Sequence, residues 1–175
     1  MAKQKHIDVW IDKLTNSIEN TISGESFPTV ISLVTYSELK SVTKTKGWNF
    51  NWKAELKKND HQVYKLTTRD NPKIIHGLVS LKLEEDHVFV SIIENAPFNI
   101  GKTKLYKGVP ANLFAYACKV SWDLGNQGSV AFVSKTRLIE HYEHSLGAVH
   151  LGNQRMIILP MDALNLIRKY FLNQK

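Results

Sequence analysis

The sequence has a single cysteine, Cys118, and no apolar run approaching the ~18–20 residues of a membrane-spanning helix. One cysteine excludes an internal disulfide and fits a reducing compartment. The first residues contain no uninterrupted apolar stretch of the kind that a secretion signal needs. No Gly-x-x-x-x-Gly-Lys phosphate loop occurs, which argues against a nucleoside triphosphatase. We therefore expect a cytoplasmic protein that does not cross a membrane.

Internal repeats, low-complexity tracts and obvious linkers are also missing. The 175 residues, 43% of them hydrophobic, suffice for one sizeable core, so we expect one domain over residues 1–175. The net charge of +7 suits anionic partners such as nucleotides, phosphates or RNA. RNA ranks below the other anions because the lysines are spread along the chain without an arginine-rich stripe.

Apolar periodicity predicts helices near both ends of the chain. An N-terminal helix over about 4–22 is predicted by spacings of three and four, with Gly24 as a stop. The residues at these spacings are Ile7, Ile11, Leu14, Ile18 and Ile22. Pro160 opens a C-terminal helix predicted over about 160–172. Further helices are predicted at 37–46, with Ser37 as N-cap, and at 110–124 and 135–147.

Between these helices, segments rich in β-branched residues predict strands. Their ranges are 27–36, 61–68, 73–83, 87–94, 128–133, 148–151 and 154–159. The second to fourth of these form an antiparallel meander. The segment "WNFNW" (48–52) is also predicted to be extended, which would place Trp48, Phe50 and Trp52 on one side. The order of elements indicates a mixed α/β domain.

The stretch from Leu105 to Asn112 places a glycine and a proline just before the helix at 110–124. A helix N-terminus leaves unpaired amides and a partial positive charge, so it attracts anions. Gly108 would let a phosphate approach the backbone closely. The alternative is an ordinary strand-to-helix connection that happens to contain Gly108 and Pro110.

This order of elements, with the glycine-containing helix entrance, resembles the GNAT (Gcn5-related N-acetyltransferase) superfamily over roughly residues 28–159. In that family an Arg/Gln-x-x-Gly-x-Gly/Ala loop binds the pyrophosphate of acetyl-CoA. Gly108 matches its glycine, whereas Leu105 and Pro110 depart from the pattern. "HYEHSLGA" (141–148) resembles the family's Tyr-Glu-Lys-x-Gly-Phe ending of the next helix, and Lys135 stands where an Asn is frequent. The resemblance implies a GNAT-like α/β fold, a mixed and mostly antiparallel sheet with helices on both faces, plus the extra N- and C-terminal helices.

The resemblance also implies an N-acyltransferase in which an amine directly attacks the thioester of acetyl-CoA. The acetyl-CoA-binding residues that it implies are Ile92, Ile93, Glu94, Tyr106, Lys107, Gly108, Val109, Ala111, Asn112 and Lys135. Tyr142 would protonate the departing CoA thiolate, with a core aromatic as the alternative. Glu94, on the Val88–Val90–Ile92 face of its strand, is a candidate general base, with a rim carboxylate as the alternative.

The acceptor is an unidentified amine, and its pocket has four candidate residues: Trp48, Phe50, Trp52 and His76. The alternative roles are anchoring 48–52 to the sheet and, for His76, an ordinary buried histidine. No metal is expected, because the inward-facing Tyr142 directs the neighbouring His141 elsewhere and no cysteine pair is present. The departures at Leu105, Pro110 and Lys135 favour a second hypothesis, a GNAT-fold binding or regulatory module without catalysis. An RNA-directed acyltransferase is the third, and a homodimer is one option for assembly.

Overall fold

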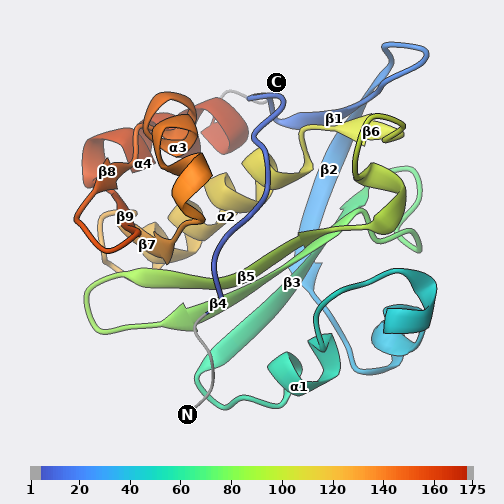
Figure 1. Cartoon of the computed structure of the whole chain (residues 1–175), viewed down its shortest axis with the longest axis horizontal. Helices are drawn as coiled ribbons and strands as arrows, with labels where there is room; N and C mark the ends of the chain where they lie inside the picture. Colours follow the sequence, from blue (N-terminus) through green and yellow to red (C-terminus); the bar gives the residue numbers. More distant parts are fainter. Residues whose placement is uncertain (1–4, 173–175) are drawn as a thin grey trace.

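The computed structural model describes residues 5–172, and within them nine strands form one sheet in the order β6-β1-β2-β3-β4-β5-β7-β9-β8 (Figure 1). The strands are β1 (Ser17–Asn20), β2 (Ser26–Leu33), β3 (His61–Thr68), β4 (Gly77–Leu83), β5 (Val88–Asn95), β6 (Tyr106–Lys107), β7 (Val130–Val133), β8 (Val149–His150) and β9 (Arg155–Ile158). Neighbouring strands are antiparallel except β5 and β7, which are parallel. The predicted mixed, mostly antiparallel sheet and its meander are confirmed.

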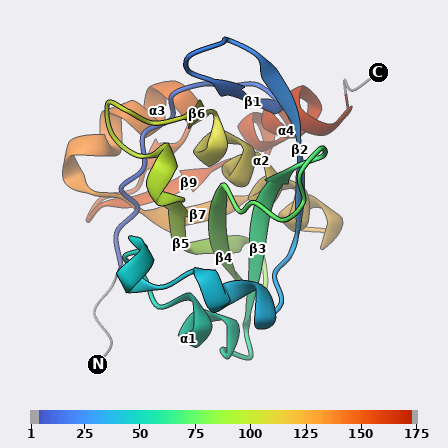
Figure 2. The same ribbon diagram turned by 90° about the vertical axis from the view of Figure 1, so that its right-hand side faces the viewer.

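Helices cover both faces of this sheet (Figure 2). The α-helices are α1 (Trp52–Leu56), α2 (Val109–Asp123), α3 (Ile139–Leu146) and α4 (Pro160–Ile167). Short 3₁₀ turns are η1 (Ser37–Ser41), η2 (Lys44–Lys46), η3 (Pro97–Asn99) and η4 (Thr136–Leu138), and a π-helical turn, η5 (Arg168–Leu172), extends α4. The predicted C-terminal helix is thereby confirmed. No helix within residues 5–172 is both long and apolar enough to span a bilayer.

Two apolar cores lie on opposite faces of the sheet because successive strand side chains alternate. Tyr64 and Leu66 of β3 pack into the core that contains α2, α3 and α4, whereas Val63 packs into the core beside α1 and η1. Burial of this kind contributes about 1.5–3 kcal/mol per fully buried aliphatic or Phe side chain. The larger core is the one that underlies the candidate site.

A bulge in β5 changes which face its last residues occupy. The register against β4 shifts between Ser80 and Leu81, so Ser91 is an extra residue on β5. Val90 before the bulge belongs to the α2 core, whereas Ile92 after it belongs to the α1 core. Placing Glu94 on the same face as Val88 and Val90 was therefore wrong, because the bulge inverts the alternation.

The N-terminal helix predicted at about 4–22 is also wrong for the described residues 5–22. Residues 5–16, which we call the N-terminal segment, contain no helix, and β1 follows. Ile7, Val9 and Ile11 are buried in the α2 core, while Asp8 and Trp10 between them are exposed. This two-residue period belongs to an extended chain. The segment is extended because Ile7 forms a parallel bridge with Ser134, which a helix could not do.

The structure also corrects two smaller predictions. Residues 48–52 are not a strand, because the Asn51 side chain accepts a hydrogen bond from Ala54 N (3.1 Å) and caps α1, which begins at Trp52. The helix predicted at 37–46 consists of the two 3₁₀ turns η1 and η2, and the N-cap position of η1 is Tyr36 instead of Ser37.

Candidate functional site

A gap opens between β5 and β7 because these parallel strands pair at only two positions, Val88 with Val130 and Phe89 with Ala131. The N-terminal segment passes through this gap in front of α2 (Figure 1). Ile7 N donates a hydrogen bond to Val133 O (2.6 Å), and Lys135 N donates to Ile7 O (3.0 Å). The chain therefore fills the β7 side of its own gap.

Tyr142 of α3 lies under the N-terminal segment and is fully buried. Its hydroxyl donates to Val9 O and accepts from Val9 N (3.1 Å). Its ring packs against Phe132 and Phe114, with centroids 5.4 and 6.0 Å away. Burial raises the pKa of the Tyr142 hydroxyl. The sequence predicts Tyr142 to be the acid that protonates the CoA thiolate, and in this conformation its hydroxyl is bonded to Val9.

The adjacent His141 also holds the N-terminal segment. Its Nε2 accepts a hydrogen bond from Ile11 N (2.9 Å), and its ring stacks on Trp10 with centroids 3.6 Å apart and planes at 14°. Burial lowers the pKa of His141, which favours the neutral ring that can accept this bond. Within the described residues no cluster of three or more potential metal ligands occurs.

The entrance of α2 is covered by residues of the same chain. Gly108 adopts a left-handed conformation (φ +102°), and its N donates to Asp12 Oδ1 (2.8 Å). Lys104 Nζ lies 2.6 Å from the second oxygen of Asp12. A Cβ at Gly108 would lie 2.9 Å from Ser17 O, so this close approach requires glycine.

The other residues predicted to bind acetyl-CoA at this entrance make internal contacts. Asn112 Nδ2 donates to Thr15 O (3.0 Å) and Gly108 O (2.8 Å). Lys107 pairs with Glu19 at 3.2 Å. Val109 and Ala111 are buried, and Tyr106 pairs with Asn20 in the sheet. In this conformation the Gly108 amide is therefore engaged by Asp12 and is not free to bind a pyrophosphate.

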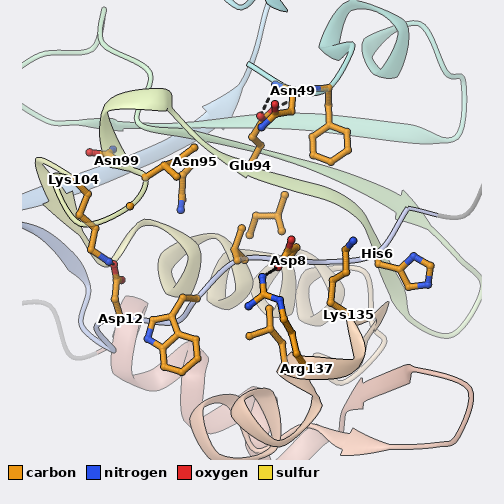
Figure 3. Close-up of a pocket in the computed structure, with 17 residues that line it drawn as sticks. His6, Asp8, Asp12, Asn49, Glu94, Asn95, Asn99, Lys104, Lys135 and Arg137 are labelled. Atoms are coloured by element: carbon orange, nitrogen blue, oxygen red, sulfur yellow. Dashed lines mark hydrogen bonds and ion pairs between the residues drawn. The ribbon is translucent and has the colours of Figure 1, made fainter. Parts of the chain in front are cut away.

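A cavity of about 570 Å³ separates the N-terminal segment from the end of β5 (Figure 3). Glu94, Asn95 and Asn99 lie along one side, and Asp8 and Asp12 lie opposite. The remaining lining includes Phe50, Ile93, Lys104, Lys135 and Arg137. Asp8 pairs with Arg137 and Asp12 with Lys104, so acidic and basic groups are matched within the cavity.

Glu94 on the cavity wall fastens β5 to residues 49–52. Its Oε2 accepts from Asn49 N (2.7 Å), and its Oε1 accepts from Trp52 Nε1 (2.8 Å) and Phe50 N (3.3 Å). The side chain is 4% exposed. These three donors use three of the roughly four acceptor sites of the carboxylate, so the base role predicted for Glu94 would have to use the remaining site on Oε2.

The predicted acceptor residues are separated by the fold. Trp48 and Trp52 are buried in the α1 core, whereas Phe50 is half-buried and lines the cavity. His76 lies elsewhere, beside a second cavity of about 360 Å³. Its Nδ1 is 3.2 Å from Asn99 Nδ2, and burial lowers the pKa of His76 to about 4.

The low pKa of His76 predicts a stability loss in mild acid. Between about pH 6.5 and pH 4 this histidine is protonated in the unfolded chain, where its pKa is near 6.5, but stays neutral in the folded chain. The contribution of neutral His76 is thus fully present above about pH 6.5 and is lost as the pH falls toward about 4. The full loss is about 3 kcal/mol. Urea unfolding of His76→Gln at pH 7 and 4.5 should show a drop about 2–3 kcal/mol smaller than in the unmodified chain.

The matched control is His150→Gln, because His150 is exposed. Between pH 7 and 4.5 its free energy of unfolding should fall by as much as that of the unmodified chain. If His76→Gln shows the same fall, His76 is not the group that titrates.

The sequence interpretation missed the role of Val9 and Asp12. A signal was present, because residues 7–12 alternate Ile7, Val9 and Ile11 with more polar neighbours. That two-residue alternation is typical of an extended segment, whereas the spacings of three and four over residues 7–22 are typical of a helix.

The fold is shared with solved N-acetyltransferases. A spermidine N-acetyltransferase from Vibrio cholerae in complex with CoA and spermine superimposes with a TM-score of 0.59 at 16% identity, covering 78% of this chain and 98% of that one. A dodecameric structure of spermidine N-acetyltransferase from Vibrio cholerae gives 0.57 at 17% identity, covering 78% and 96%. No family model and no curated protein matches the sequence. The GNAT fold predicted from the sequence is thereby confirmed.

Proposed function

We propose that the chain is an acyl-CoA-dependent N-acyltransferase that transfers an acetyl group from acetyl-CoA to an amine. The observation that carries the proposal is the gap between β5 and β7 beside the α2 entrance, in a fold shared with N-acetyltransferases. One of those proteins is in complex with CoA and spermine.

The end of β5 supports this proposal. Among residues 5–172, no backbone hydrogen bond joins Ile92–Asn95 to the N-terminal segment. This edge of β5 therefore faces the 570 Å³ cavity, where the resemblance implies that the pantetheine arm pairs with the strand. The acceptor is specified only as an amine, because Arg137, Lys104 and Lys135 offset the carboxylates that would attract a polycation.

A GNAT-fold binding module without catalysis is the second candidate. It is favoured by the N-terminal segment, whose buried Ile7, Val9 and Ile11 belong to the main core. In that case the segment would be a permanent part of the fold and acetyl-CoA would not bind.

The first test is binding of acetyl-CoA to the full chain. A ligand that binds only the native state raises its thermal stability. We expect acetyl-CoA to raise the melting temperature and to release free thiol when a panel of primary amines is added. ATP is the matched control, because it carries phosphates without pantetheine and should give a smaller shift. No shift with acetyl-CoA, either in the unmodified chain or in chains whose N-terminal segment has been loosened, would leave the binding module as the function.

A further inference from the structure

We infer that the N-terminal segment occludes the acyl-CoA site of its own chain and is displaced when the donor binds. The inference rests on the proposed function. It follows from three sets of contacts, at the α2 entrance, along the β7 side of the gap, and at the end where the segment is anchored.

At the α2 entrance, the Asp12 carboxylate occupies an anion position. It accepts from Gly108 N (2.8 Å) and lies 2.6 Å from Lys104 Nζ. Backbone amides and a positive partial charge at a helix N-terminus favour a negative group there. A phosphate of the donor would need the same Gly108 amide and the same lysine. Asp12 and a donor phosphate therefore exclude one another.

Along the gap, the backbone of the segment supplies polar groups that a pantetheine arm also carries. Ile7 exchanges hydrogen bonds with Val133 and Lys135, and Val9 pairs both its N–H and its carbonyl with the Tyr142 hydroxyl. Pantetheine has two amides, so it offers N–H and carbonyl groups of the same type. The Tyr142 hydroxyl becomes available to a donor only after Val9 leaves.

Within the described chain, the segment continues into a paired strand of the sheet only at its C-terminal end. From Ser17 onward β1 pairs with β2 on one side and β6 on the other. Residues 5–13 instead touch the sheet through the Ile7 bridge. Their side chains form ion pairs in which at least one partner is partly exposed: Lys5 with Glu55, Asp8 with Arg137, Asp12 with Lys104 and Lys13 with Glu19. Release of residues 5–13 would leave the strands of the sheet paired as they are.

The test compares acetyl-CoA affinity, measured by calorimetric titration, in full chains that differ in this segment. Asp12→Lys removes the carboxylate from Gly108 and places a charge beside Lys104. Val9→Pro removes the N–H bonded to Tyr142 and leaves Asp12 in place. We expect each variant to bind acetyl-CoA at least 10-fold more tightly than the unmodified chain.

The matched control for charge is Glu25→Lys, an equal charge change at an exposed residue in the turn between β1 and β2. It should leave the affinity of acetyl-CoA within about twofold. Equal tightening in Glu25→Lys and Asp12→Lys would show that net charge, and not release of the segment, sets the affinity.

Hydrogen exchange reports on the segment independently of turnover. The amides of Ile7, Val9 and Ile11 are hydrogen-bonded, so they should be protected in the unmodified chain and should exchange faster when saturating acetyl-CoA is added. The amides of β1 should not change. If acetyl-CoA binds as tightly to the unmodified chain as to both variants, with no change in exchange, the segment does not occlude the site and the proposed function stands. If exchange shows release in folded variants that bind no acetyl-CoA, the proposed function is overturned and the inference falls with it.

Discussion

Replacing Glu94 with alanine is expected to lower the free energy of unfolding by about 3–5 kcal/mol. The buried carboxylate accepts hydrogen bonds from Asn49 N, Phe50 N and Trp52 Nε1. Removing it leaves three donors without their acceptor at a largely buried position, and it detaches residues 49–52 from β5. For a domain of this size the melting temperature should fall by about 10 °C.

Chemical denaturation can measure this loss against Glu84→Ala. Glu84 makes a half-exposed ion pair with Lys82 at 3.1 Å, which is worth about 1 kcal/mol at most. Glu94→Gln should fall between the two, because it keeps one acceptor oxygen. A Glu94→Ala protein as stable as Glu84→Ala would show that the three hydrogen bonds do not hold residues 49–52.

Tyr142→Phe is expected to reduce turnover by about 100-fold or more while acetyl-CoA binds at least as tightly. A phenol that donates a proton to the leaving group acts only in the reaction, so its loss lowers kcat. The same change removes both hydrogen bonds that hold Val9, so it also loosens the N-terminal segment. Falling kcat with unchanged or tighter donor binding is a combination that a purely structural role would not produce.

The measurement is best made in the Asp12→Lys background, where the segment is already released and the two effects separate. Tyr64→Phe is the matched control, since Tyr64 is a buried tyrosine of β3 whose hydroxyl donates to Gln62 (2.6 Å). Its kcat should not change. Unreduced kcat in Tyr142→Phe would make Tyr142 a core aromatic, the alternative that its position among Phe114 and Phe132 supports.

The elements that could be predicted from the sequence are those whose pattern is local. The range 61–68 was predicted to be a strand and is observed as β3. The signals for this strand, its own residues and the turn residues on either side of it, are all local in the sequence. The N-terminal segment could not be placed in this way. Its partners Ser134 and Tyr142 are more than 120 positions away, and they make the extended form of residues 7–11 favourable where spacing alone favours a helix.

The sequence predicted some of the residues that line the candidate site, but it did not predict how they are arranged. Phe50, Glu94 and Lys135 do line one cavity, but His76 lies at another, and the hydroxyl of Tyr142 meets Val9. The bulge at Ser91 explains the face of Glu94. An extra residue in one strand shows itself only in the pairing with its neighbour, which a single sequence does not contain.

Because the N-terminal segment is covalently joined to the site that it covers, diluting the protein does not dilute the segment. A free donor then competes with the N-terminal segment, whose equilibrium between covering and leaving the site does not depend on protein concentration. Its apparent dissociation constant is the intrinsic one divided by the fraction of open chains, so an open fraction of about 1% weakens binding about 100-fold. If the segment occludes the site as inferred, a substitution at Ile7 can change the affinity for the donor solely by changing the fraction of chains in which the segment covers the site. An affinity measured on this chain would therefore report the stability of residues 5–13 as much as the fit of the donor.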